Sequence, residues 1–261
     1  MDGSFSRVDG SGDPAALVRY LDEAGELAPF QEADRLLLAE LRIHPGDRVL
    51  DVGCGTGEDA VAIADAARVT GLDASATMIA EARRRAAERG VAATFVVGSA
   101  ERLGLAGGAF DACRFERVLQ HLGDPLAALR EAARVLRPGG RVAAFEPDWT
   151  NLDVTGGDPA VATAAREARL RGIASPAVGA ALPGLLAAAG FVDVRSRPLP
   201  LSGAGPVVLR GLRLGDYARA AVATGAITAA AAADWLAAAE RGELRARATM
   251  HLASATRPGV T

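Results

Sequence analysis

The feature that most constrains this chain is a run with glycine at three alternate positions, Gly53, Gly55 and Gly57. It follows an apolar stretch at residues 49–52 and precedes residues 58–67, which have helical spacing of apolar side chains. Glycines at this spacing let the backbone approach a ligand closely and adopt conformations that a Cβ would hinder. In an open α/β sheet, ligands bind in the crevice beyond the carboxyl ends of the strands. The run therefore predicts a strand, a ligand-binding loop and a helix, in that order.

Strand and helix patterns alternate after this loop. Helical segments separate the strands expected at residues 68–72, 93–97, 110–115 and 141–145. Repeated β–α units of this kind predict a parallel, doubly wound sheet. Two further strands, expected at residues 191–197 and 249–255, fit a hairpin at one sheet edge that helices interrupt. The predicted fold class is α/β, with a doubly wound, mostly parallel seven-stranded sheet, an antiparallel edge strand and added helices.

The same pattern divides the 261 residues into three parts. Residues 1–42 carry N-terminal helices, although residues 1–13 are rich in Gly, Ser and Asp and are expected to be frayed. Residues 43–204 and 248–261 form the ligand-binding α/β domain. Residues 205–247 are an Ala- and Leu-rich helical insertion. We expect the N-terminal helices and the insertion to form a lid over the ligand site.

Charge and composition exclude several classes of function. The net charge is −3 with both signs interspersed, so neither nucleic acid nor a membrane is an expected partner. No run of about 18 apolar residues occurs, and the first residues lack the pattern of a leader, so a cytoplasmic protein is expected. The chain has no lysine, which excludes a Schiff base with pyridoxal phosphate and a Walker A loop. Its two cysteines, Cys54 and Cys113, form no cluster with histidine, so no metal site is expected.

The glycine run does not match the dinucleotide-binding pattern G-x-G-x-x-G. That pattern would need a third glycine at position 58, where the chain has Glu58. Glu58 and Asp59 at the start of the following helix would also repel a pyrophosphate. The loop therefore favours a ligand that has positive charge and no phosphate.

Four sequence motifs, in order, carry a resemblance to a known family. They are the glycine run at residues 49–57, Gly-Leu-Asp-Ala-Ser-Ala-Thr-Met at 71–78, the Phe-Asp and Val-Leu-Gln-His-Leu motifs within 110–122, and Arg-Val-Leu-Arg-Pro-Gly-Gly at 134–140. Residues 49–147 resemble a class I S-adenosylmethionine-dependent methyltransferase of the ubiquinone/menaquinone-type (methyltransferase type 11) group. The resemblance implies a Rossmann-like fold, S-adenosylmethionine as cofactor and S-adenosylhomocysteine as product.

The resemblance also assigns the methionine and ribose parts of the cofactor site. The loop residues Gly53, Cys54, Gly55 and Gly57 would hold the methionine part. Asp51 would lie near its ammonium group, or would only cap the next helix. Asp73, at the end of the second strand, would accept hydrogen bonds from both ribose hydroxyls, as an ionised carboxylate can.

The adenine part is assigned less completely. Ala74 and Met78 would line the ring, although Met78 could equally be core packing. Many relatives have an aspartate after the third strand, but this chain has Ser99 there. The adenine contact would then be made by Ser99, by Glu101 or by the backbone of Ala100.

Candidates for acceptor binding stand near the ends of later strands. Methyl transfer needs an acceptor held in line with the methyl group and shielded from water, and a base only where the acceptor loses a proton. His121 is expected to line this site or act as the base. Glu146 is expected to be catalytic, or else to cap or to pair with an arginine. Trp149, Tyr20, Tyr217 and His251 are expected to bind substrate, with packing as the alternative for the tyrosines and a core position as that for His251.

The predicted function is methyl transfer from S-adenosylmethionine to an oxygen, nitrogen or carbon of a small-molecule acceptor, in secondary metabolism or quinone-like synthesis. An alternative keeps the fold and cofactor but uses them for non-methyl chemistry such as cyclisation. Nucleic-acid methylation is disfavoured because residues 114–117 read Arg-Phe-Glu-Arg instead of Asn/Asp-Pro-Pro-aromatic. A monomer or a homodimer is expected.

Overall fold

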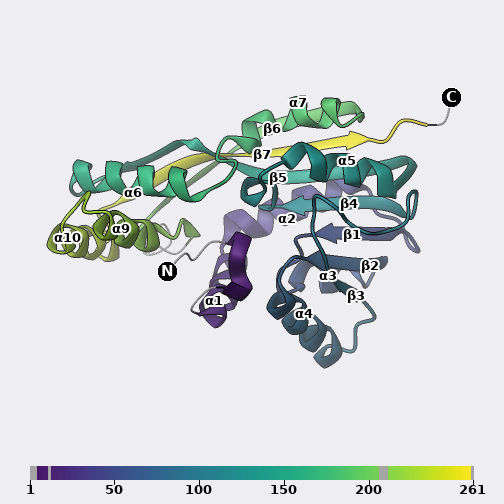
Figure 1. Ribbon diagram of the computed structural model, residues 1–261, viewed down its shortest axis with the longest axis horizontal. Coiled ribbons are helices and arrows are strands. Elements are labelled where there is room, and N and C mark those ends of the chain that lie inside the picture. The colour runs from purple at the N-terminus through teal and green to yellow at the C-terminus, as the bar shows by residue number, and fades with distance from the viewer. Residues whose placement is uncertain (1–4, 11–12, 206–210, 260–261) are drawn as a thin grey trace.

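The computed structural model describes residues 5–10, 13–205 and 211–259. Within these residues a seven-stranded sheet has the order β3-β2-β1-β4-β5-β7-β6 (Figure 1). Its strands are β1 (Arg48–Val52), β2 (Arg68–Asp73), β3 (Thr94–Val97), β4 (Phe110–Glu116), β5 (Leu136–Thr155), β6 (Val192–Ala204) and β7 (Arg245–Thr256). Strands β1 to β5 are parallel, and β7 runs antiparallel to both β5 and β6. The predicted α/β class is confirmed, and the antiparallel β6–β7 pair forms the predicted edge.

Helices cover both faces of the sheet. The described helices are η1 (Phe5–Gly10), α1 (Pro14–Gly25), α2 (Ala28–Leu41), α3 (Glu58–Ile63), α4 (Ala76–Glu88), η2 (Leu119–His121), α5 (Pro125–Val135), α6 (Pro159–Gly172), α7 (Val178–Ala188), α9 (Leu214–Ala223) and α10 (Ala229–Glu240). Aspartate side chains accept hydrogen bonds at the start of α1, α5 and α6, each of which has proline in its first turn. These caps satisfy backbone donors that a helix start leaves unpaired.

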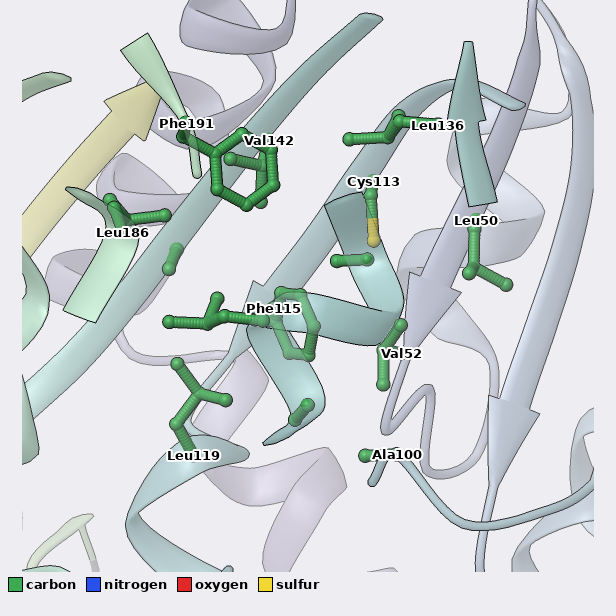
Figure 2. Packing of buried hydrophobic residues seen from close by; sticks show 14 of the residues in the cluster. Leu50, Val52, Ala100, Cys113, Phe115, Leu119, Leu136, Val142, Leu186 and Phe191 are labelled. Carbon is green, nitrogen blue, oxygen red and sulfur yellow. The ribbon is translucent and has the colours of Figure 1, made fainter. Parts of the chain in front are cut away.

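Two apolar clusters lie on opposite faces of the sheet because successive strand residues point to opposite sides. Leu50, Cys113, Phe115 and Val142 pack with α5 and α7 on one face (Figure 2). Their neighbours, including Val49, Ala112, Ala143 and Phe145, pack with α2, α3 and α4 on the other face. A sheet buried on both sides explains why its strands read as nearly continuous apolar runs.

The strand β5 is much longer than its sequence pattern predicts. The expected strand ends at Phe145, but β5 continues to Thr155. Its second half pairs with β7 through Asp153–Thr155, after an irregularity in register between Asp148 and Asp153. Strands β6 and β7 are long at the same end of the sheet. They pair with each other without a break from Arg195 to Ala204 of β6. The prediction of a short strand was wrong because the partner that extends it lies about a hundred residues further along the chain.

Helices α6, α9 and α10 cover these strand extensions and form a third apolar cluster with them, centred on Trp149, Trp235 and Leu244. We call α6, α9, α10 and the strand ends that they cover the helical lobe. Figure 1 shows the lobe at the left end of the molecule, with α3 and α4 below the strands. Residues 206–210 of the predicted insertion and residues 1–4 and 11–12 of the predicted frayed terminus lie outside the described residues. Within the part of the chain that the structure describes, no helix is both long and apolar enough to cross a bilayer.

Candidate cofactor and acceptor site

A cavity of about 850 Å³ lies beyond the carboxyl ends of the parallel strands, between the α/β core, α1 and the helical lobe. Its volume is within the usual range for a ligand pocket. The cavity wall includes most of the residues that the sequence predicts for the site. These are Gly53, Cys54, Gly55, Asp73, Ala74, Met78, Ser99, Ala100, Glu101, Tyr20, His121, Trp149 and Tyr217. Asp51, Gly57, Glu146 and His251 do not line it.

The glycine loop, residues 53–57, follows β1. Its glycines are required because their φ values are positive and because neighbouring side chains leave no room for a Cβ at Gly53 or Gly57. Gly53, Gly55 and Gly57 have φ values of 72°, 50° and 78°. This left-handed region favours glycine. A Cβ on Gly53 would lie 2.4 Å from Val118 Cγ2, and one on Gly57 would lie 2.7 Å from the Cβ of Ala82. Gly57 therefore supports the packing of the loop on α4, although it does not reach the cavity.

Asp73 holds the glycine loop and the start of α4 in one arrangement. Its Oδ2 accepts a hydrogen bond from the Gly55 amide at 3.0 Å, and its Oδ1 accepts one from the Ser75 amide at 2.8 Å. Burial raises the pKa of Asp73, although these amide donors act in the opposite direction. The predicted ribose carboxylate thus lies in the cavity wall, next to the loop that is expected to hold methionine.

Residues 5–10 form an N-terminal clamp on the start of α4, next to the expected adenine residues, that has no signal in the sequence. Asp9 of η1 accepts hydrogen bonds from Ser75 Oγ at 2.5 Å and from the Ala76 and Thr77 amides at 2.8 and 3.2 Å. These bonds, with that of Ser75 foremost, lower the pKa of Asp9 to about 2. Val8 consequently packs against Met78 and lines the cavity with it. Residues 5–10 are therefore ordered in η1, contrary to the predicted fraying, because Asp9 is a second cap for α4.

The three alternatives for the adenine contact, Ser99, Ala100 and Glu101, all lie in the wall. Ser99 Oγ accepts a hydrogen bond from the Glu101 amide at 3.2 Å. The Glu101 carboxylate accepts one from the Asp124 amide at 2.9 Å, just before α5. Both side chains are thus used to shape the turn after β3, and the choice among the three contacts stays a prediction.

Arg114 of β4 organises an acidic cluster at the end of the cavity near the loop. Its guanidinium lies 3.1 Å from Asp51 and 2.8 Å from Asp59, and it also pairs with Asp34 and Glu116. The predicted contact of Asp51 with the cofactor is therefore not seen, because its carboxylate is 1% exposed and faces Arg114. Asp34, Asp59 and Glu116 do line the cavity.

Burial and neighbouring charges give the acids of this cluster different protonation states. Burial, and then the negative charge of Glu116, raises the pKa of Asp34 to about 9. Although burial acts against it, the positive charges of Arg117 and Arg114 hold the pKa of Glu116 at about 2. Ligand oxygens of Asp34, Asp59 and Glu116 lie within 4.8 Å of one another, as in a metal site, but Arg114 already bridges all three. This cluster has no signal in the sequence, since the partners of Arg114 come from three separate segments of the chain.

Aromatic and basic side chains form the opposite end of the cavity. Trp149 donates a hydrogen bond from Nε1 to Gln120 Oε1 at 2.7 Å, and the guanidinium of Arg169 lies 3.6 Å from the centre of its ring. Tyr217 faces the same guanidinium at 4.9 Å. Tyr20 of α1 donates a hydrogen bond to the Gly211 carbonyl at 3.2 Å, so α1 is joined to the lobe. Two of the predicted substrate residues, Trp149 and Tyr217, are thus brought together by Arg169, which has no signal in the sequence, while Tyr20 lies 5.2 Å from the guanidinium of Arg213.

His121 lies in η2, between the two ends of the cavity. Burial, followed by the positive charges of Arg169, Arg117 and Arg213, lowers the pKa of His121 to about 4. The imidazole is therefore neutral near pH 7. A neutral imidazole can donate one hydrogen bond and accept another.

Glu146 is a positioning residue in this structure. Its Oε1 accepts hydrogen bonds from the Val118 and Leu119 amides, each at 2.7 Å, and its Oε2 accepts one from the Gln120 amide at 3.3 Å. The side chain is fully buried and lies outside the cavity wall. The expected direct catalytic contact of Glu146 is thus replaced by capping, which was the alternative: the carboxylate fixes the turn that carries His121.

His251 also lies away from the cavity. It is on β7, where its neighbour Met250 lines the wall. Adjacent residues of a strand point to opposite faces, so His251 faces the other side of the sheet. The predicted substrate contact of His251 is therefore not seen, because the register of β7 directs Met250 inward.

Comparison with known proteins identifies the class of protein to which this cavity belongs. Residues 50–144 match a family described as a methyltransferase domain. A ubiquinone/menaquinone biosynthesis C-methyltransferase from Bdellovibrio bacteriovorus is 40% identical over 114 residues, which are 42% of this chain and 48% of that protein. The chain spans about half of the length of the curated relatives it matches.

Two solved structures are similar over most of the chain. The YcgJ protein from Bacillus subtilis has a TM-score of 0.66 and 19% identity, covering 88% of this chain and all of that one. The [4+2]-cyclase SpnF has a TM-score of 0.54 and 27% identity, covering 90% of this chain and 84% of that one. This protein therefore carries a class I S-adenosylmethionine-dependent methyltransferase domain, and the predicted family and cofactor class are confirmed.

Proposed function

We propose that this chain transfers a methyl group from S-adenosylmethionine to a small-molecule acceptor. The observation that supports this most directly is that one cavity joins the glycine loop and Asp73 to a pocket formed by His121, Trp149 and Tyr217. Transfer requires the donor and the acceptor to meet in line and without water.

The residues of the first half of the cavity fit the cofactor. Its ammonium and sulfonium groups are positive, and the wall near the loop carries the ionised Glu116 together with Asp59 and Asp73. Asp73 would hold the ribose, and Met78 with Val8 would cover the adenine. The bound cofactor supplies an electrophilic methyl group; the protein supplies position, charge and a dry cavity.

The added helices would exclude water and complete the acceptor pocket. Helix α1 contacts both halves of the molecule, since Asp22 pairs with Arg85 of α4 at 2.7 Å and Tyr20 bonds to Gly211. We therefore retain the sequence prediction that residues 1–42 and 205–247 form a lid, and we add α6, whose Arg169 reaches the cavity. Cytoplasmic location, a role in secondary metabolism, and a monomeric or homodimeric state stay predictions from the sequence.

A second function is supported by one comparison. The similar structure that combines 27% identity with coverage of 90% of this chain is a cyclase. The cavity of about 850 Å³ has room for an acceptor beside the cofactor, and aromatic rings at its far end suit a hydrophobic substrate. The same fold and cofactor would then serve cyclisation in place of methyl transfer.

The test has two stages. Thermal unfolding is first measured with S-adenosylmethionine, S-adenosylhomocysteine or NADH; we expect the two adenosyl ligands to raise the unfolding temperature, and a rise with NADH alone would overturn the proposal. A panel of phenols, amines and acidic-carbon compounds is then incubated with S-adenosylmethionine. Formation of S-adenosylhomocysteine with an equal amount of methylated product supports transfer. Acceptor rearrangement with no S-adenosylhomocysteine formed would establish the cyclase alternative.

A further inference from the structure

Arg169 of α6 is a buried cation that the described protein does not neutralise. Its side chain is 6% exposed and lies in the wall of the acceptor end of the cavity. Its Nη1 donates to the carbonyl of Leu212, and the rings of Trp149 and Tyr217 stack near the guanidinium. Its Nε is buried without a partner. Across residues 5–10, 13–205 and 211–259, no carboxylate lies within ion-pair distance of Arg169.

The other arginines around the cavity are paired with acids. Arg114 meets four carboxylates, and Arg85 meets three. Arg117 pairs with Glu116 at 3.2 Å, and Arg213 pairs with Asp216 at 2.5 Å. A buried charge is costly unless it is paired and hydrogen-bonded. Arg169 departs from this pattern at the place where an acceptor would bind.

The cavity is divided by charge. Near the loop its wall carries Asp59, Asp73 and Glu116, and the arginines beside them, Arg114 and Arg117, are paired with acids. At the other end Arg169 and Arg213 line the wall with neutral His121 between them and the loop. Burial and then the charges of Arg169, Arg117 and Arg213 lower the pKa of His121, and all three arginines line the same cavity as His121. An anion in this volume would complete the missing pair.

We propose that the acceptor carries an oxyanion, a carboxylate or a phosphate, which Arg169 binds between the rings of Trp149 and Tyr217. A guanidinium is planar and matches the oxygens of both groups, while its stacking on Trp149 fixes its orientation. His121 would donate a second hydrogen bond to the same oxyanion. This inference rests on the proposed function, because it names the acceptor class for that site.

The test measures ligand binding to the protein saturated with S-adenosylhomocysteine, by isothermal titration calorimetry. The probes are benzoate, phenyl phosphate, neutral benzamide and benzylammonium. Because hydrogen bonds to charged groups are stronger than neutral ones, we expect one of the anions to bind at least about tenfold more tightly than benzamide. The anion that binds more tightly shows whether the acceptor carries a carboxylate or a phosphate. Benzamide or benzylammonium binding as well as both anions would overturn the inference.

Matched variants locate the effect at Arg169. Arg169→Met should abolish the preference for the anion, and Arg169→Lys should retain part of it, since charge remains without the planar fork. Arg171→Met, on the exposed side of α6, should leave it unchanged. The affinity for S-adenosylhomocysteine should be the same in all four proteins. Retention of the anion preference in Arg169→Met would contradict the inference, whereas absence of S-adenosylhomocysteine binding in the unaltered protein would instead contradict the proposed function. The wild-type comparison of both anions with benzamide and benzylammonium is decisive even if Arg169→Met does not fold.

Discussion

Asp73 Oδ2 accepts the amide hydrogen of Gly55 at 3.0 Å, so the carboxylate expected at the ribose also holds the glycine loop in place. One side chain therefore links the two segments that follow β1 and β2 and are expected to bind the cofactor. Its second oxygen bonds to the Ser75 amide, which connects the same carboxylate to α4. Removing the charge of Asp73 should weaken both the ribose contact and the loop.

The first prediction concerns Asp73→Asn. We expect the affinity for S-adenosylhomocysteine to fall by about ten- to a hundredfold, because hydrogen bonds to a charged acceptor contribute about 1.5–3 kcal/mol. Isothermal titration calorimetry measures this loss. Asp65→Asn removes an exposed carboxylate beyond α3 and serves as the control. Equal affinities of the Asp73 and Asp65 variants would show that Asp73 does not contact the cofactor.

The second prediction separates backbone strain from crowding in the glycine loop. Gly53→Ala places a Cβ 2.4 Å from Val118 at a φ of 72°. Gly46→Ala has a similar φ of 90° with no atom within 4 Å of the new Cβ. We expect Gly46→Ala to cost about 1–2 kcal/mol of the free energy of unfolding and Gly53→Ala about 2–4 kcal/mol, since overpacking is added to strain. Urea denaturation gives both values; identical losses would mean that Val118 moves aside freely.

The third prediction tests the role of Glu146. Glu146→Gln keeps the size of the side chain but turns one acceptor of backbone hydrogen bonds into a donor. We expect a loss of about 1–3 kcal/mol in stability, together with a higher KM for the acceptor and an unchanged affinity for S-adenosylhomocysteine, because η2 carries His121. Glu240→Gln, at an exposed position of α10, is the control. A large fall in kcat with stability unchanged would restore the direct catalytic role.

The sequence was most informative where structure is determined locally. The glycine run, the strand that precedes it and Asp73 at the next strand end lie within 25 residues of one another, and each has a local physical signal. The alternation of β and α segments likewise predicted a doubly wound, mostly parallel sheet. These features placed the loop end of the cavity.

The acceptor end depends on contacts between distant segments, for which a single sequence has no local signal. Asp9 caps a helix 66 residues away, and Arg169 stacks on Trp149 only because β5 extends under α6. Pairing with β5 determines the register of β7, and this register places Met250 in the cavity wall instead of His251. The buried Arg114 reads as an interruption of an apolar strand until Asp34, Asp51 and Asp59 are placed around it.

The last prediction concerns His121 and pH. The pKa of His121 is about 4 in the folded protein and 6.5 in its ordinary state, so the unfolded chain binds more protons between these values. Stability should therefore fall as the pH drops through this range, by about 2 kcal/mol between pH 7 and pH 5. His121→Gln should show a shallower decline, whereas the turn variant His44→Gln should retain the wild-type slope. Urea denaturation at several pH values measures the slopes, and NMR should show the His121 imidazole titrating near pH 4. Titration of His121 near 6.5, with equal slopes in all three proteins, would show that neither burial nor the charges of Arg169, Arg117 and Arg213 shift its pKa.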